Sequence, residues 1–386
     1  MGGSGVRSVP FFKPSIGEEE ISRVSEVLKS GWLTRGSLTE EFEARCKEFL
    51  GANGCIALSS ATAGLHLSLL ALGVGEGDEV ITTALTHVAT VQAILYVGAR
   101  PVFADIDPVT MNISPSDVLS KISPKTKVIL PVHFAGHPCE MDELEEIASS
   151  HGIYIVEDAA HAFGASYKGK MIGGKGFSSI TVFSFYPNKP ITTGEGGLVC
   201  GGEDIIDKIR LLSHHGVVYP IKERRWMYSA VELGYKYNFT DIQAAIGLAQ
   251  LSKAKDLHAK RERWFKLYNE LFKDNEALIR PEPRGYVYSS YYIYPLRLNL
   301  DALKCSRDEF AIALEEEGVG VSIHYSPPVH LHPYYRVKLG VGEGSLPTTE
   351  RVSESELTLP LYPEMSDEEF YFVVDRVLKL VNRWKR

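Results

Sequence analysis

Ser184-Phe185-Tyr186-Pro187-Asn188-Lys189 sets a lysine among aromatic and small residues, where a surface lysine would have polar neighbours. The Gly-rich run Thr192–Gly197 follows at once, and its glycines let the backbone turn tightly without a Cβ penalty. Upstream, Asp158 ends a short apolar run. Pyridoxal phosphate needs a lysine amine for a Schiff base and a carboxylate to keep its pyridine nitrogen protonated. Lys189 and Asp158 can supply these groups, and Ser184 can bind the phosphate.

Short β-branched runs alternate with longer helical stretches in the first half of the chain. The strand-like runs are 55–58, 79–82, 101–104, 127–130, 154–156 and 180–183, and an apolar stretch at 65–72 is typical of a helix. This alternation predicts a mostly parallel sheet covered by helices, with ligands beyond the carboxyl ends of the strands. Asp158, Ser184 and the turn Ser59–Thr62 each follow such a run, so we expect them to converge.

The character of the chain changes after Leu251, where a charged helical stretch runs through Lys260–Arg263. We interpret it as a long helix that connects to a second domain, although it equally fits a solvated helix face. We therefore expect a large α/β domain over residues 10–250 and a smaller C-terminal α/β domain over 251–386. The expected elements of the second domain are a strand at 292–298, a helix at 307–317 and a strand at 319–324.

The composition narrows the class of protein. A formal net charge of −8 argues against a general nucleic-acid or anionic-membrane surface. Five cysteines lie scattered without CxxC spacing, which indicates neither a metal site nor a disulfide framework and fits a reduced cytoplasm. No apolar run approaches the roughly 18 residues that span a bilayer, and the N-terminus lacks a signal-peptide pattern. We expect a cytoplasmic protein without a membrane partner.

Several blocks of the sequence together carry a family resemblance. They are 59–66 (SSATAGLH), 131–136 (PVHFAG), 157–160 (EDAA), 183–189 (FSFYPNK) with 194–197 (GEGG), and 234–241 (GYKYNFTD). In this order they resemble the DegT/StrS-type sugar-nucleotide aminotransferases over nearly the whole chain. The blocks SSATAG, EDAAHA and GYKYN are most similar to the enzymes that form UDP-4-amino-4-deoxy-L-arabinose. The resemblance implies the pyridoxal-phosphate fold type I, like that of aspartate aminotransferase, and a homodimer with shared active sites.

The resemblance also implies roles for the central residues. Lys189 would be the catalytic residue that holds the cofactor and later carries a proton between the amino-acid α-carbon and the cofactor. Asp158 would bind the pyridine nitrogen, although an aspartate at this junction could simply cap a helix. Ala61 and Thr62 would form a phosphate cradle with Ser184, because helix N–H groups attract anions; the alternative is ordinary N-capping.

Four further positions are implied to contact the ligands. His87 occupies the place where relatives carry an aromatic residue stacked on the cofactor ring, and His161 would lie near the cofactor 3′ oxygen, unless it is a core histidine. Asn238, with Lys236, would reach the phosphate of the partner subunit, unless its tyrosine neighbours are plain core aromatics. We assign His324 to the sugar substrate.

The sequence leaves the roles of two sets of residues undecided. His330 and His332 follow His324, but Pro327-Pro328 and the lack of nearby carboxylates argue against a metal site. Three arginines are unranked candidates for diphosphate recognition, because the guanidinium forms a bidentate fork: Arg35, Arg224 and Arg225.

The implied reaction passes an amino group from L-glutamate, through pyridoxamine phosphate, to a ketone of a nucleotide-linked sugar, with C4 as the expected position. An aminocyclitol aminotransferase acting on a keto-inositol shares the same motifs and is the alternative. A keto-sugar dehydratase that acts at C3 would carry His in place of Lys189. A nonenzymatic regulator on this scaffold would be expected to lose Lys189 or Asp158.

Overall fold

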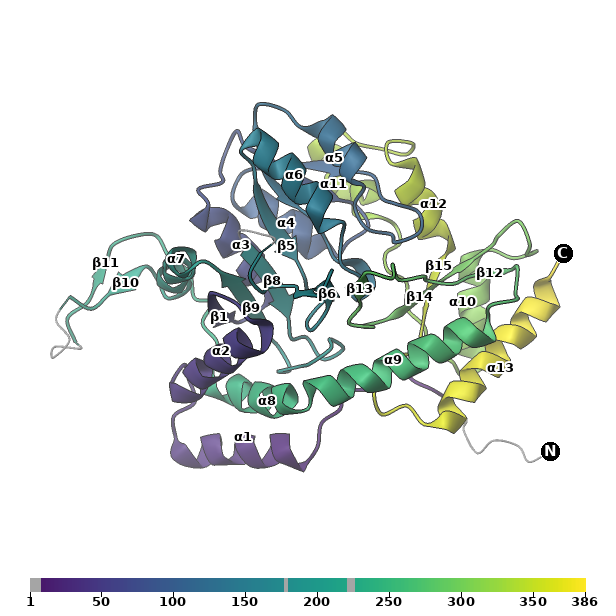
Figure 1. Ribbon diagram of the computed structural model, residues 1–386, viewed down its shortest axis with the longest axis horizontal. Coiled ribbons are helices and arrows are strands. Elements are labelled where there is room, and N and C mark those ends of the chain that lie inside the picture. The colour runs from purple at the N-terminus through teal and green to yellow at the C-terminus, as the bar shows by residue number, and fades with distance from the viewer. Residues whose placement is uncertain (1–7, 177–179, 221–225) are drawn as a thin grey trace.

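The computed structural model describes residues 8–176, 180–220 and 226–386 (Figure 1). A seven-stranded sheet forms its centre, in the order β1-β9-β8-β5-β4-β2-β3. The strands are β1 (Gly54–Leu58), β2 (Glu79–Thr83), β3 (Arg100–Ala104), β4 (Thr126–Leu130), β5 (Tyr154–Asp158), β8 (Ile180–Ser184) and β9 (Gly197–Gly201). β9 runs antiparallel to both of its neighbours, β1 and β8, and the other neighbouring strands of this sheet pair in parallel. The prediction of a mostly parallel sheet is confirmed.

Helices cover both faces of the sheet, so its strands are apolar on both sides, as parallel sheets require. One hydrophobic cluster joins one strand face to α3 (Ala61–Ala71), α4 (Val88–Tyr96) and α7 (Glu203–Ser213). The other joins the opposite face to α2 (Ser37–Leu50), α5 (Pro115–Lys121), α6 (Met141–His151) and α8 (Asp241–Ser252). Gly64 lets α3 approach closely, because a Cβ there would lie 2.7 Å from the Val182 side chain. The result is a three-layer α/β unit.

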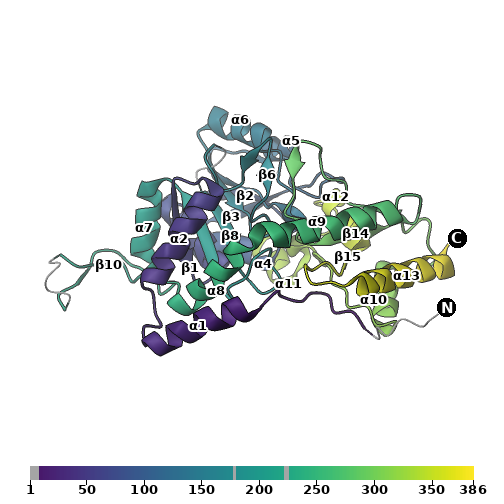
Figure 2. The same ribbon diagram turned by 60° about the horizontal axis from the view of Figure 1, so that its bottom comes forward.

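The chain after α8 forms the expected connecting helix and a further apolar cluster. The long helix α9 (Ala254–Leu271) leads away from the large sheet (Figures 1 and 2). It packs with α10 (Arg307–Glu316), α13 (Asp367–Trp384) and an antiparallel sheet of β12 (Leu278–Ile279), β14 (Tyr294–Leu298) and β15 (Glu356–Leu359). Val9, near the N-terminus, joins this cluster, whereas Val329 and Tyr335 pack back beside α4. The division at residue 250 stays a prediction.

The remaining elements are short or lie at the periphery. They are α1 (Glu18–Ser30), α11 (Pro333–Leu339), α12 (Pro347–Ser355), the 3-10 turns Phe134–Gly136 and Val329–Leu331, and the short strands β6 (Ser166–Tyr167), β7 (Lys170–Met171), β10 (Val217–Val218), β11 (Ser229–Ala230) and β13 (Val287–Tyr288). Strands β10 and β11 pair in an arm that projects from the body (Figure 1). Among the described residues, no helix combines the length and apolar character needed to cross a bilayer.

The structure confirms one of the predicted elements and corrects another. The helix that carries the apolar stretch 65–72 begins at Ala61 with Ser60 as its cap, which is the start that the predicted phosphate cradle or N-cap requires. The strand expected at 319–324 does not form; Val319 and Ser322 make isolated bridges to Val9 and Thr358. At Gly320 a Cβ would lie 2.7 Å from the backbone nitrogen of Phe11, so this segment meets the N-terminal chain instead of a regular ladder.

Candidate active site

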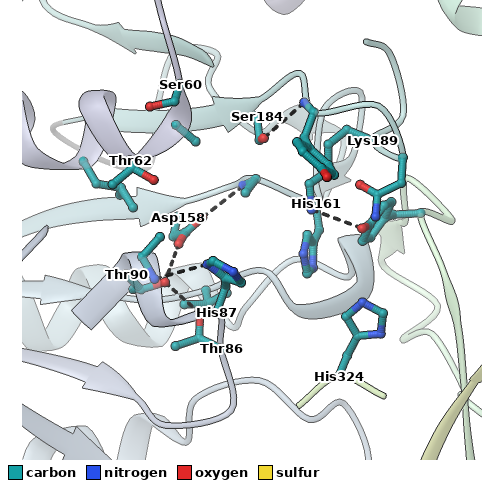
Figure 3. Close-up of a pocket in the computed structure, with 18 of the residues that line it drawn as sticks. Ser60, Thr62, Thr86, His87, Thr90, Asp158, His161, Ser184, Lys189 and His324 are labelled. Carbon is teal, nitrogen blue, oxygen red and sulfur yellow. Dashed lines mark hydrogen bonds between the residues drawn. The ribbon is translucent and has the colours of Figure 1, made fainter. Parts of the chain in front are cut away.

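A cavity of about 410 Å³ lies beyond the carboxyl ends of β1, β5 and β8 (Figure 3). Its walls contain every predicted site residue except Asn238: Ala61, Thr62, His87, Asp158, His161, Ser184, Lys189 and His324. The C-terminal half of the chain contributes Tyr292, His324 and Tyr325. The structure therefore confirms the prediction that these strand ends converge on one site.

Lys189 lies in the loop after β8, and its side chain reaches into the cavity. The backbone N–H of Lys189 donates to the Tyr186 carbonyl at 2.9 Å, which closes a turn. Its amine donates to the Tyr292 hydroxyl at 3.1 Å. Burial lowers the pKa of Lys189 to about 7, and the charge of Asp158 opposes that shift in part. Near neutral pH a large fraction of this amine is unprotonated, which is the nucleophilic form.

Asp158, at the end of β5, is held by two donors. The Thr90 hydroxyl donates to Oδ2 at 2.8 Å, and the backbone N–H of Ala160 donates to Oδ1 at 3.1 Å. Thr86 lies 2.7 Å from the Thr90 hydroxyl and continues the chain of hydrogen bonds. No helix follows Asp158, so the alternative role of helix cap is wrong. The carboxylate is buried and oriented at the cavity wall.

The first turn of α3 presents backbone donors at another wall. The Ser60 side chain accepts the N–H of Ala63 at 3.1 Å and so caps the helix. The N–H groups of Ala61 and Thr62 precede the first intrahelical bonds and are available to an anion. Gly197 packs against this turn, because a Cβ on it would lie 2.5 Å from the Ser60 carbonyl carbon. Ser184 lines the same cavity, and a phosphate cradle made by this turn and the Ser184 hydroxyl stays a prediction.

His87 caps α4 with its own ring. Its Nδ1 accepts the N–H of Ala89 at 3.2 Å, while the ring borders the cavity edge-on to Tyr325. Burial and the nearby Lys189 charge lower the pKa of His87. The sequence did not indicate this capping role. Stacking of His87 on the cofactor ring stays a prediction.

His161 is a buried histidine with one defined tautomer. Its Nδ1 accepts the N–H of Ala135 at 3.2 Å, so the hydrogen resides on Nε2, which lies 3.3 Å from the Tyr325 hydroxyl. Burial lowers the pKa of His161 well below its ordinary value, and the charge of Lys189 adds to this effect. The ring also packs against Tyr292, with centroids 4.4 Å apart. His161 therefore presents a neutral donor at the cavity.

His324 is fixed by a small polar network behind the cavity. Its backbone N–H donates to Glu356 at 2.6 Å, and its Nδ1 lies 2.8 Å from the Thr358 hydroxyl. Burial and the Lys189 charge lower the pKa of His324 to about 3. Burial raises the pKa of Glu356 to about 8. The His324 imidazole is thus neutral at working pH.

The remaining predicted residues lie elsewhere. Asn238 bridges to Leu58 and donates to the Phe239 carbonyl at 3.3 Å, away from the cavity of its own chain. Arg35 pairs with Glu43 at 2.7 and 3.0 Å. Arg224 and Arg225 lie outside the described residues. His330 bonds Glu350 at 3.0 Å, and the described residues hold no group of three or more His, Cys, Asp or Glu side chains suited to a metal ion.

The sequence analysis assigned no role at the site to Thr90, Tyr292 or Tyr325, which line the cavity together with other unassigned residues. Thr90 lies in the first turn of α4, whereas Thr86 precedes the capping residue of that helix, so no helical spacing in the sequence singled out Thr90. Tyr292 comes from the segment before β14, where Ser290 donates to the Gly136 carbonyl at 3.1 Å. At Gly136 a Cβ would lie 1.9 Å from the Ser290 Oγ. This close approach explains a glycine at the end of the block 131–136.

Comparison with known proteins agrees with this geometry. The model of the DegT/DnrJ/EryC1/StrS aminotransferase family matches residues 14–378. The chain belongs to this family. This aminotransferase is 47% identical to the uncharacterized protein MJ1066 of Methanocaldococcus jannaschii, over 97% of the chain and 98% of that protein. It is 41% identical to the spore coat polysaccharide biosynthesis protein SpsC of Bacillus subtilis, over 97% of each chain.

Solved structures show the same fold and the cofactor. The putative sugar aminotransferase Spr1654 of Streptococcus pneumoniae, in its pyridoxamine-phosphate form, superposes with a TM-score of 0.91 at 33% identity, covering 97% of this chain and 98% of that chain. It has also been solved in its pyridoxal-phosphate form. The chain is a pyridoxal-phosphate-dependent aminotransferase of fold type I. A buried amine, an oriented carboxylate and a helix N-terminus that packs on Gly197 fit this cofactor.

Proposed function

We propose that this enzyme transfers an amino group from L-glutamate to the C4 ketone of a nucleotide-linked sugar. The observation that carries the proposal is the meeting, in one cavity, of the Lys189 amine, the Asp158 carboxylate and the first turn of α3. The nucleotide linkage is supported by DesI, a relative of 29% identity and TM-score 0.88, covering 98% of this chain and 94% of that chain. DesI was crystallised in the presence of its TDP-sugar product.

The roles of the residues follow from their positions. Pyridoxal phosphate, when bound, supplies an electron sink for amino transfer between an amino acid and a ketone. Lys189 would hold it through the amine, and Asp158 would keep a proton on its ring nitrogen. Ala61, Thr62 and Ser184 would bind the phosphate. Once released, the Lys189 amine can move a proton at the substrate carbon, since its pKa of about 7 lets it both accept and donate near neutral pH.

His324 would contact the sugar. The Thr358 hydroxyl hydrogen-bonds Glu356 on one side and the His324 Nδ1 on the other, and so holds the ring in place. This leaves the Nε2 of the neutral ring for a polar group of the substrate. A sugar hydroxyl matches it, because a hydroxyl can donate or accept. We propose this contact as the role of His324 in the reaction.

We propose that the enzyme works as a homodimer. The arm of β10 and β11 leaves large apolar side chains exposed, with Trp226 at 76% and Leu233 at 81% exposure. A second apolar surface, lined by Ile16, Ile21 and Leu28, adjoins Pro187 and Gly194 near the lysine loop. Exposed apolar area of this kind marks a contact surface. In such a dimer Asn238 would serve the phosphate site of the partner.

Mixing two inactive variants tests the shared site. A hybrid dimer contains one Lys189→Ala subunit and one Asn238→Ala subunit. One of its two sites would combine an intact Lys189 with an intact Asn238 from the other subunit. Recovery of activity on mixing supports the shared site. Continued inactivity after mixing, with hybrid formation shown by mass spectrometry, would reject it.

The five free thiols fit the expected cytoplasmic location.

A substrate panel tests the acceptor. The protein is loaded with pyridoxamine phosphate and offered UDP-, dTDP- and GDP-linked keto sugars and keto-inositols, while the visible absorbance of the lysine-bound cofactor is followed. A response to one nucleotide sugar supports the proposal, and analysis of the aminated product gives the carbon. A response to keto-inositol alone would favour the aminocyclitol alternative. L-Glutamate is compared with other amino acids by the rate at which each bleaches the absorbance.

A further inference from the structure

Arg261 on α9 lies buried directly behind the loop that carries Lys189. Its Nη1 donates to the Pro190 carbonyl at 3.0 Å, and its Nη2 donates to the Lys189 carbonyl at 3.2 Å. The side chain is 6% exposed. No carboxylate among the described residues lies within ion-pair distance of it, and its Nε has no partner there. The guanidinium therefore donates its hydrogen bonds to two backbone carbonyls of the loop that carries Lys189.

Burying a guanidinium without an acidic partner is less favourable for folding than burying an apolar side chain. Removing its charge from water costs free energy that an apolar side chain of similar volume would not incur. Burial accordingly lowers the pKa of Arg261 to about 10. By contrast, Arg263, two residues later on the same helix, is exposed and pairs with Asp367 at 2.6 Å. Packing alone does not account for an arginine at position 261.

The contacts of Lys189 show what Arg261 does there. The Lys189 N–H is held by the Tyr186 carbonyl at 2.9 Å, and the Lys189 carbonyl is held by Arg261. Both peptide groups that flank the Lys189 Cα are thus fixed. The side chain then leaves the backbone in one direction, toward the Tyr292 hydroxyl. Hydrogen bonds from a charged donor are roughly twice as strong as neutral ones, which suits this task.

We propose that Arg261 is a positioning residue that holds the Lys189 peptide so that the amine stays buried in the cavity. It touches neither cofactor nor substrate and acts through the lysine. Because α9 begins beside the large sheet and extends into the C-terminal cluster, Arg261 also ties this helix to the lysine loop. The inference concerns the aminotransferase itself and does not depend on which sugar is the acceptor.

The test uses the protein freed of cofactor, in which Lys189 is acylated competitively at a series of pH values and its peptide is quantified by mass spectrometry. Wild-type Lys189 should label with a midpoint near pH 7. In Arg261→Met the loosened loop lets water reach the amine, so the midpoint should rise by about one pH unit or more. Capture of added pyridoxal phosphate should slow by about tenfold or more, the loss expected for a hydrogen bond to a charged group.

Arg263→Met is the matched control, because it removes an exposed arginine from the same helix. It should keep the wild-type midpoint and capture rate. Arg261→Lys retains the charge but has no planar fork. Its labelling midpoint and capture rate should therefore lie between those of the wild type and those of Arg261→Met. Circular dichroism and thermal unfolding report the fold. A folded Arg261→Met with the wild-type midpoint would overturn the proposal, as would an equal shift in Arg263→Met. If Arg261→Met does not fold, a wild-type midpoint in Arg261→Lys overturns it.

Discussion

Thr90 donates a hydrogen bond of 2.8 Å to Asp158 across 68 residues of sequence, and so joins the first turns of α4 to the end of β5. The bond holds the Asp158 side chain in one orientation at the cavity wall. A carboxyl group oriented in this way suits its predicted role as the partner of the cofactor ring nitrogen. The helix that follows β2 thereby positions a side chain of a site built mainly on β5 and β8.

Replacing Thr90 with Val should weaken cofactor binding. The isosteric change removes one hydrogen bond to a buried charge, which is worth about 1.5–3 kcal/mol, or roughly a 10- to 100-fold rise in the dissociation constant of the cofactor. Thr90→Ser keeps the hydroxyl and should bind nearly as the wild type does. Equilibrium titration by fluorescence quenching measures both. Equal affinity in Val and Ser variants would show that the bond to Asp158 is unimportant.

The pH dependence of Lys189 follows from its burial. The folded protein without cofactor should show an amine that titrates near pH 7, against about 10.5 in the unfolded chain. Since the unfolded chain binds more protons between these values, this group makes the folded state gain stability as pH rises from 7 to 10.5. Urea unfolding at pH 7 and pH 9.5 measures the gain, and Lys189→Met should lack this part of it. An equal gain in both proteins would contradict the lowered pKa.

Gly197 should tolerate no side chain. A Cβ on Gly197 would lie 2.5 Å from the Ser60 carbonyl carbon and 2.6 Å from the Ala61 nitrogen, so Gly197→Ala must displace the first turn of α3. The expected result is a loss of affinity for pyridoxal phosphate, and for inorganic phosphate as its competitor. Gly285→Ala, at a glycine with open space around its Cβ position, is the control. Unchanged phosphate affinity in Gly197→Ala would remove this turn from the phosphate site.

Several strands of the central sheet could be predicted, because a short apolar run in the sequence is enough to indicate each of them. The apolar runs that became β1, β4, β5 and β8 are buried on both faces, so their composition alone indicated strands. Their polar ends then marked the site, since parallel strands bring their carboxyl ends to one edge. Asp158 and Ser184 were found in this way.

The rest depends on contacts that no local pattern encodes. Tyr292 meets Lys189 across 103 residues, and Tyr325 meets His161 across 164. Such pairs come together through the docking of the C-terminal segments on the large sheet. The strand predicted at 319–324 failed for the same reason, because the segment makes only isolated bridges to two distant parts of the chain, at Val9 and at Thr358. His87 was assigned by family position, which gave its place in the cavity but not its bond to Ala89.

The most direct test of the account is to identify the lysine that holds the cofactor. The protein is loaded with pyridoxal phosphate, reduced with borohydride to make the bond permanent, digested and mapped by mass spectrometry. We expect the label on Lys189 alone, and none in a folded Lys189→Ala variant, which should also lose turnover. A label on another lysine, or normal turnover by Lys189→Ala, would contradict the site described for this aminotransferase.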